Sequence, residues 1–201
     1  MRKPAPVPSG NGARVLPGQV RIIGGIYKRT PISVAPLAGL RPTPDRVRET
    51  LFNWLGQDLA GWHVVDVFAG TGALSFEAVS RGASQVRAFE KDASLVNRIE
   101  ALKSKLGADA LSVLRGDGVA LLRSLPPGQQ HLVLIDPPFD SELFVPALEA
   151  ALPGLTPEGL IYLEAPAAWA DADLSRLGLR LRRHGRAGAV HFHLLGRADV
   201  V

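Results

Sequence analysis

The chain has 201 residues, of which 46% are hydrophobic, and it carries a formal net charge of +4. A chain of this length can bury a substantial core, so we expect one domain with small appendages. It has no cysteine, no N-terminal apolar segment typical of a signal peptide, and no apolar run near the roughly 18 residues of a membrane span. These features favour a cytoplasmic protein without disulfides or a membrane anchor.

The charge is distributed unevenly along the chain. Residues 1–50 carry a net charge of +7, residues 51–169 a net charge of −6, and residues 170–201 a net charge of +3. Basic runs are often only solvated surface. The contrast between the segments nevertheless favours a polyanion, such as a nucleic acid, as the partner of the basic flanks.

The first 42 residues predict a tail and a short hairpin. Residues 1–18 are rich in Pro and Gly and lack periodicity, which is typical of a disordered basic tail. Within residues 19–42, Gly24-Gly25 lies between two apolar runs and predicts the positive-φ turn of a hairpin. We expect this hairpin segment to face the polyanion and residues 43–201 to form the main domain.

A helix is predicted to begin at Thr43-Pro44-Asp45. Thr43 suits the N-cap position, and proline suits the first helical position. The apolar stripe of this helix consists of Val47, Leu51, Trp54 and Leu55. Other faces then carry the charged side chains Arg46, Arg48 and Glu49.

Strands and helices alternate along the rest of the chain. We expect helices at residues 76–81, 94–106, 118–124 and 141–151, the first of them beginning near Ala73. Strands are predicted at residues 64–67, 85–89, 111–114, 131–135, 159–164, 180–183 and 189–195, with the last two antiparallel. This order predicts an α/β fold with a mostly parallel sheet and helices on both faces.

A glycine-rich turn follows the first strand of this series and looks like a nucleotide-binding loop. A dinucleotide fingerprint would place a third glycine where Ser75 stands. Asp66, at the end of the strand, would repel a pyrophosphate but attract an ammonium group. The loop therefore favours S-adenosylmethionine over a nicotinamide cofactor, with contacts from Asp66, Phe68, Ala69, Gly70, Thr71 and Gly72.

Two further carboxylates suit the same cofactor. Glu90 ends the next predicted strand, roughly 20 residues after the glycine loop, where an acidic side chain binds a ribose diol. It is equally well explained as a solvated charge at a strand end. Asp117 follows the third strand and is placed to accept the adenine amino group, although it also suits the N-cap of the next helix.

The motif Asp136-Pro137-Pro138-Phe139 carries the predicted chemistry. Its rigid backbone would let the Asp136 carboxylate and the Pro137 carbonyl accept hydrogen bonds from one NH2 group, while Phe139 stacks on the ring. By itself an aspartate here is more often a cap, and Pro-Pro more often marks a loop. Together with the glycine loop, the motif predicts methylation of a planar amine.

The chain also resembles the RsmD family over residues 19–195. The segments that carry this resemblance are Arg21–Gly25, Leu40–Leu55, Phe68–Gly72, Ser80–Ala83 and Asp136–Phe139. The resemblance implies a seven-stranded class I methyltransferase domain that methylates the N2 amine of one guanine in bacterial 16S ribosomal RNA. It also implies that the segment around Thr43 and Arg46 closes over the cofactor and faces RNA.

Candidates for contacts with RNA phosphates are the basic residues Arg21, Lys28, Arg29, Arg41 and Arg48. Among the five histidines, only His191 and His193 form a group, and two residues without further ligands favour a solvated or core role over a metal site. We therefore expect no metal, and we expect a monomer that acts on 16S rRNA within a small ribosomal subunit. Two alternatives stay open: a methyltransferase of another planar amine, such as adenine N6, and a non-catalytic RNA-binding module.

Overall fold

The computed structural model describes residues 18–37 and 42–199. The predicted tail and Arg41 therefore lie outside the described residues, Gly18 excepted, and the division of the chain at residues 18 and 42 stays a prediction. Over the two described ranges, none of the helices combines the length and apolarity needed to cross a membrane.

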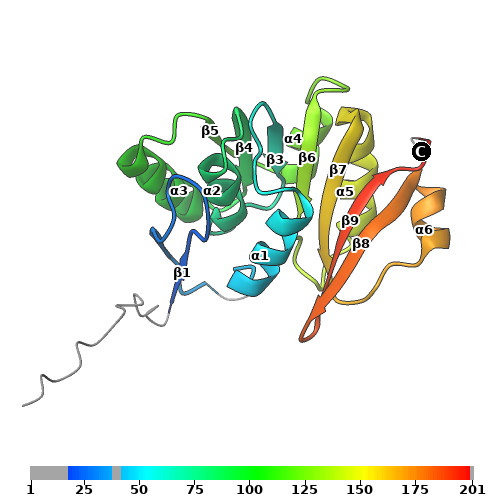
Figure 1. The fold of residues 1–201 in the computed structure, drawn as a ribbon, viewed down its shortest axis with the longest axis horizontal. Coiled ribbons are helices and arrows are strands. Elements are labelled where there is room, and N and C mark those ends of the chain that lie inside the picture. Colours follow the sequence, from blue (N-terminus) through cyan, green and yellow to red (C-terminus); the bar gives the residue numbers. More distant parts are fainter. Residues whose placement is uncertain (1–17, 38–41, 200–201) are drawn as a thin grey trace, which may run out of the picture.

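A seven-stranded sheet forms the centre of the molecule (Figure 1). Its order is β5-β4-β3-β6-β7-β9-β8, and every neighbouring pair is parallel except the two pairs that involve β9. The strands are β3 (His63–Asp66), β4 (Gln85–Glu90), β5 (Leu111–Arg115), β6 (Gln130–Ile135), β7 (Leu155–Ala165), β8 (Leu179–Ala187) and β9 (Val190–Arg197). All seven predicted strands are present, and the antiparallel pairing of the last two is confirmed.

Helices cover both faces of the sheet (Figure 1). Alternate side chains of a strand point to opposite faces, so Val64 joins one core cluster and Val65 joins the other. The Val64 face is covered by α1 (Asp45–Trp54), α2 (Ala73–Ser80) and α3 (Ala93–Leu106). The Val65 face is covered by α4 (Gly118–Arg123), α5 (Phe144–Ala151) and α6 (Asp171–Arg176), the last of which the sequence did not predict.

Four acidic residues reach the same edge of the sheet. Asp66 is the last residue of β3 and pairs in register with Leu134, so Asp136 lies two residues farther along β6. Ile135 pairs with Leu163, which places Asp136 level with Glu164 on β7. Glu90 ends the neighbouring strand β4. In a parallel sheet this carboxyl edge is where ligands bind.

The N-terminal hairpin differs from the prediction. β1 (Gln19–Arg21) and β2 (Pro31–Ser33) pair antiparallel, but the nine residues from 22 to 30 connect them rather than Gly24-Gly25 alone. This connection lies against the end of α2, where the Ile26 N–H donates to the Ser80 carbonyl at 2.8 Å. Gly25 has the predicted positive φ, 71°, and a Cβ there would lie 1.7 Å from that carbonyl oxygen, so both the backbone conformation and the space require glycine.

The predicted N-cap of the first helix is also wrong. Helix α1 begins at Asp45 with Pro44 as its N-cap, and no side chain caps its first turn. Thr43 is buried, and its side chain instead forms a hydrogen bond with Glu164. A side chain that binds across the fold cannot cap its own helix, so the tertiary contact replaces the local one.

We predict that Gly25→Ala lowers the free energy of unfolding by roughly 2–4 kcal/mol, because left-handed strain adds to overpacking against Ser80. The matched control is Gly61→Ala, which has a similar φ of 81° but no atom within 4 Å of the added Cβ. The control should be destabilised only by the left-handed strain, by about 1–2 kcal/mol. Urea unfolding followed by circular dichroism measures both, and equal losses would contradict a role for the Ser80 contact.

Candidate active site

The glycine loop between β3 and α2 adopts a backbone conformation that side chains disfavour. Gly70 and Gly72 have φ values of 53° and 77°, in the left-handed region. Gly72 is the N-cap of α2, and a Cβ there would lie 3.2 Å from both Phe76 and Ile99. The Ala69 N–H donates to the Phe89 carbonyl at 2.9 Å, which ties the loop to β4. The five predicted loop residues thus form one turn beside the ends of two strands.

Asp66 is buried directly beneath this turn. Burial and the negative charge of Glu90 raise the pKa of its carboxyl to about 7, and a hydrogen bond from Ser75 limits the rise. The Ser75 hydroxyl donates to Asp66 Oδ2 at 2.6 Å. The residue that replaces the third glycine of a dinucleotide loop therefore orients the acidic residue that favours an ammonium group.

Glu90 is bonded to the glycine loop and is not a free surface charge. Its Oε2 accepts from the Gly70 N–H at 2.8 Å, and its Oε1 accepts from the Asp92 N–H at 2.8 Å. Asp117 is the N-cap of α4, where Oδ1 accepts from the Ala120 N–H at 2.8 Å, so the capping role is confirmed. Its side chain is exposed, and contact with the cofactor stays a prediction.

The predicted catalytic motif follows β6 as a tight turn. The Pro138 carbonyl accepts from both the backbone N–H and the hydroxyl of Ser141, at 3.0 and 2.6 Å. Pro137 is buried, whereas Phe139 is 38% exposed. Burial, Glu164 and Asp66 raise the pKa of the Asp136 carboxyl well above its ordinary value. Within residues 18–37 and 42–199, no donor is hydrogen-bonded to this carboxylate.

Glu164 is the second buried carboxylate of this edge. The Tyr162 hydroxyl donates to its Oε1 at 2.8 Å, and Thr43 also forms a hydrogen bond with it. Burial raises the pKa of Glu164, while the bonds from Thr43 and Tyr162 and the positive charge of Arg48 oppose this rise. Burial and Glu164 also raise the pKa of Tyr162 well above its ordinary value, so its hydroxyl stays a donor.

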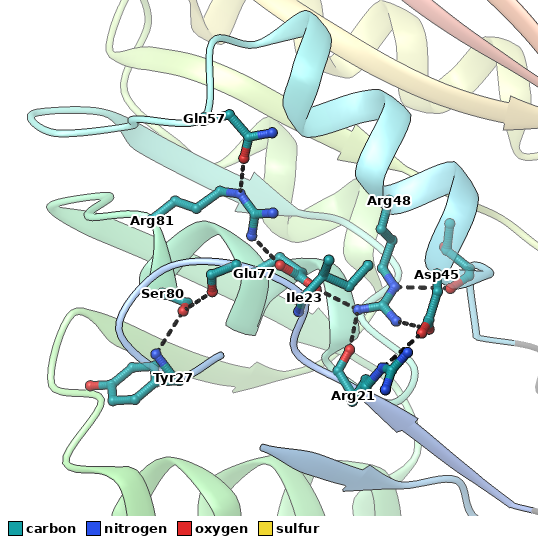
Figure 2. Close-up of polar contacts among 11 residues, drawn as sticks. Arg21, Ile23, Tyr27, Asp45, Arg48, Gln57, Glu77, Ser80 and Arg81 are labelled. Atoms are coloured by element: carbon teal, nitrogen blue, oxygen red, sulfur yellow. Dashed lines mark hydrogen bonds and ion pairs between the residues drawn. The ribbon is translucent and has the colours of Figure 1, made fainter. Parts of the chain in front are cut away.

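Arg48 does not lie where the sequence predicts it. Its side chain is fully buried and forms ion pairs with Asp45 and Glu77, both at 2.6 Å (Figure 2). The same guanidinium donates to the carbonyls of Arg21 and Thr43, at 2.9 and 3.0 Å. A buried, fully bonded guanidinium cannot reach an RNA phosphate, so the predicted phosphate contact of Arg48 is wrong.

The other predicted basic residues that the structure describes remain accessible. Lys28 and Arg29 are exposed on the connection between β1 and β2, and Arg46 is exposed on α1. Arg21 is partly exposed and lies 3.3 Å from Asp45. A surface ion pair of this kind contributes little to stability and does not prevent a phosphate contact.

Several site residues were not identified from the sequence. Glu164 ends a predicted strand just as Glu90 does, so the same signal was available for it. Glu77 is a single carboxylate within the otherwise apolar run 76–79 of α2, which is a signal for burial. Tyr162 and Ser75 have no such signal, because nothing local distinguishes them from ordinary core residues.

The histidines occupy structural positions. His193 is buried between the Leu163 carbonyl, 3.2 Å from Nδ1, and the Trp169 N–H, which donates to Nε2 at 3.2 Å. Burial lowers the pKa of His193 to about 4, so the ring is neutral. This is the core role that the sequence favoured. In the described part of the chain, no three His, Asp or Glu side chains are grouped as metal ligands.

The seven-stranded sheet of this order, with helices on both faces, is the fold of a class I methyltransferase. Solved structures with this fold include a putative methyltransferase from Escherichia coli, with a TM-score of 0.74 and 34% identity over 90% of this chain and 98% of that one. A putative methylase from Haemophilus influenzae has a TM-score of 0.73 and 28% identity, over 90% of this chain and all of its own.

The family model described as "Conserved hypothetical protein 95" matches residues 20–196. Ribosomal RNA small subunit methyltransferase D of Haemophilus influenzae is 38% identical over 153 residues, which are 73% of this chain and 79% of that protein. The protein of the same name from Escherichia coli K12 is 34% identical over 192 residues, or 90% and 91% of the two chains. The chain therefore belongs to the RsmD family.

We predict that Asp66→Asn stabilises the free protein at pH 8 but not at pH 4. A folded-state pKa near 7, against 3.8 for the free side chain, means that the contribution of Asp66 to stability is present below pH 4 and is lost as the pH rises to 7. Asparagine does not ionise, so the variant avoids this loss, which amounts to a few kcal/mol. Urea unfolding at several pH values measures the difference.

The matched control is Asp92→Asn. Hydrogen bonds from Ser94 and Leu95 lower the pKa of Asp92, so removal of this charge should not stabilise the protein at high pH. An Asp66→Asn variant whose stability follows that of the wild type at every pH would contradict the raised pKa of Asp66.

Proposed function

We propose that this protein transfers the methyl group of S-adenosylmethionine to the N2 amine of a guanine in 16S ribosomal RNA. The observation that carries the proposal is the turn at Asp136-Pro137, where a carboxylate with a raised pKa lies level with Glu164 and beside the glycine loop. The names of the relatives, ribosomal RNA small subunit methyltransferase D, support the substrate class.

The residues around the glycine loop fit this cofactor. Burial and the nearby charge of Glu90 raise the pKa of Asp66, and a bound ammonium group would favour its ionised form. Glu90 ends β4 and suits the ribose hydroxyls of the cofactor. Asp117 follows β5 and suits the adenine amine. Thr43 and Arg46 belong to the segment that we propose closes over the bound cofactor. The cofactor itself supplies a methyl group on a sulfonium, which an amine can accept directly.

The Asp136 turn holds the acceptor amine. The lone pair of the guanine N2 is delocalised into the ring, and hydrogen bonds from both N–H groups to Asp136 and the Pro137 carbonyl would localise it and fix its direction. Phe139, partly exposed at the rim, stacks on the guanine ring. A guanine that is paired or stacked must first be turned out of its helix to reach this position.

Asp136 is also suited to hold the proton that the amine loses. As the N–C bond forms, positive charge develops on N2, and a nearby carboxylate stabilises it. A carboxylate with a raised pKa binds a proton more strongly than an exposed aspartate does. Glu164, level with Asp136 and bonded to Tyr162, contributes to this raised pKa.

RNA phosphates would contact the exposed basic residues of the N-terminal segment. Lys28 and Arg29 lie on the connection that packs on α2, and Arg21 lies beside the start of α1. Helix α1 begins near the carboxyl edge of the sheet, whereas the connection contacts the last turn of α2, which lies toward the opposite edge because α2 runs antiparallel to the strands (Figure 1). We retain these three residues and Arg41 for phosphate contacts and exclude Arg48, because its charge is neutralised inside the protein.

Transfer of a labelled methyl group tests the proposal. Small subunits and naked rRNA from cells that lack this activity are incubated with the protein, and the labelled nucleoside is identified. We predict label in N2-methylguanosine and a fall in kcat of about 10²–10³-fold in Asp136→Ala, because removal of one polar group that stabilises transition-state charge has effects of this size. The control is Asp140→Ala, an exposed acidic residue in the same loop, which should retain activity.

Two results would contradict this function. Label in N6-methyladenosine would assign the site to another planar amine. An absence of label despite measured cofactor binding would favour a non-catalytic module.

The pH dependence of transfer provides a further prediction. Protonated Asp136 accepts the N–H of the amine more weakly and cannot take up the proton that the amine loses, so kcat/KM should fall on the acidic side, at a pH well above 4 because the pKa is raised. Glu164→Gln removes a negative neighbour, lowers the pKa of Asp136 and should shift this acidic limb to lower pH. Glu142→Gln, a change of the same chemistry at a residue far less buried than Glu164, is the control and should leave the limb in place. A limb unaffected by Glu164→Gln would contradict the coupling between the two carboxylates.

A further inference from the structure

A cavity of about 500 Å³ opens between the start of α5 and helix α6. Its walls come from Phe144 and Val145 of α5, residues 165–169 after β7, and Asp173, Arg176 and Leu177 of α6. This volume lies within the range of roughly 300–1,000 Å³ that is usual for sites of small organic groups. None of these residues belongs to the proposed cofactor site or to the turn Asp136–Phe139, which we call the acceptor turn.

Residues that line the cavity are close in sequence to the residues around Asp136. Ala165, one of its lining residues, directly follows Glu164, which lies level with Asp136. Phe144 begins the helix that follows the acceptor turn, only five residues after Phe139. The cavity therefore lies at the same edge of the sheet as Asp136 and Glu164, but on the face that α5 and α6 cover, opposite the Glu164 side chain.

The lining suits a planar aromatic ring with a polar rim. The rings of Phe144 and Trp169 lie 6.5 Å apart between centroids and are inclined at 46°. At the mouth, Arg176 lies 3.4 Å from Asp173, and its side chain is 80% exposed. Aromatic faces stack on nucleobases without regard to sequence, and an accessible guanidinium can bind a phosphate or a base edge.

The wall that carries Trp169 is held in place by a buried residue. His193 accepts a hydrogen bond from the Trp169 N–H and contacts the Leu163 carbonyl, so it connects the end of β7 with the segment that lines the cavity. Because the ring is neutral and buried, this bond does not change near neutral pH. The bond comes from the backbone N–H of Trp169, so the sheet positions the backbone of this wall in advance of any ligand.

The lining of the cavity carries one acid, Asp173, and one base, Arg176, and the β8–β9 turn beside it adds positive charge. Residues 179–197, which form β8 and β9, contain five arginines and no acidic residue. Arg186 pairs in register with His191, which pairs with Ala165, so the Arg186 backbone lies two strands, about 10 Å, from the cavity wall. The Arg186 guanidinium donates to the Gly188 carbonyl at 2.9 Å and stays exposed at the β8–β9 turn. This charge suits a polyanion and disfavours a basic ribosomal protein.

We propose that this cavity binds a second nucleobase of the RNA, one that neighbours the target guanine in the folded substrate and stacks on Trp169. The proposal rests on the proposed function, because it assigns the substrate strand a second anchor beside the acceptor turn. A guanine turned out of its helix leaves its neighbours unstacked, and a stacking site for one of them offsets part of that cost.

The test compares Trp169→Ala, Trp169→Phe and Trp62→Ala. The control residue Trp62 stacks on His131 just before β3, at the opposite edge of the sheet. We expect Trp169→Ala to raise the KM for small subunits and the Kd for rRNA about 5- to 150-fold, the effect of losing one base stacked on an aromatic ring, with the Kd of S-adenosylmethionine unchanged. Trp169→Phe should recover most of the affinity, and Trp62→Ala should have a normal KM.

A second variant covers the case in which Trp169→Ala does not fold. Val145 lines the cavity and is 41% exposed, so we expect substitution there to leave the fold intact. Val145→Glu should weaken RNA binding by placing a negative charge in the cavity, whereas Val145→Ala should not. Unchanged RNA affinity in folded Trp169→Ala and Val145→Glu would overturn the proposal. So would a loss seen with protein-containing subunits but not with naked rRNA, because the cavity would then bind a protein.

Failure of the proposed function gives a different result. In that case the wild-type protein forms no N2-methylguanosine, whatever residue stands at position 169. Direct measurement of rRNA affinity without turnover still decides whether the cavity binds a base.

Discussion

The buried carboxylate of Glu77 determines how the N-terminal segment and α1 are attached to the sheet domain. It lies on α2 without exposure and is neutralised by Arg48 and Arg81, while the Ile23 N–H donates to it at 2.7 Å (Figure 2). Loss of the carboxylate would leave two guanidinium groups buried without a counter-charge, which costs about 3–5 kcal/mol. One side chain therefore connects three segments that are distant in sequence.

The same network extends from Glu77 to the carboxyl edge of the sheet. Arg48 donates to the Thr43 carbonyl, and the Thr43 side chain bonds to Glu164, whose charge raises the pKa of Asp136. Arg48 also lowers the pKa of Glu164 through its positive charge. The buried arginine thus serves the electrostatics of the acceptor turn, although it contacts neither the turn nor RNA. Its position explains why a segment expected to face RNA carries one basic residue that points inward.

Local patterns were sufficient for most of the fold. Short apolar segments alternating with helical ones located all seven strands, and the acidic residues that end β3 and β4 followed directly from them. Predictions failed where a distant partner replaces a local preference: Thr43 bonds to Glu164 instead of capping α1, and Ser80 shapes the turn at Gly25. The prediction for Arg48 failed for the same reason, because the burial of Arg48 is favourable only through its ion pair with Glu77 on another helix. The cavity beside Trp169 was not predictable, since three separate elements form it.

The cofactor site and the acceptor site are not independent electrostatically. Asp66 lies under the glycine loop, yet its negative charge is one cause of the raised pKa of Asp136. A cation bound beside Asp66 offsets that charge and lowers the pKa of Asp136, so more of it is ionised at neutral pH. The ionised carboxylate accepts an N–H of the amine strongly and can take up its proton, which the protonated acid cannot do. Under the proposed function, binding of the cofactor therefore prepares the acceptor site for the guanine, and the parallel strands that bring these carboxylates together make this coupling a property of the fold.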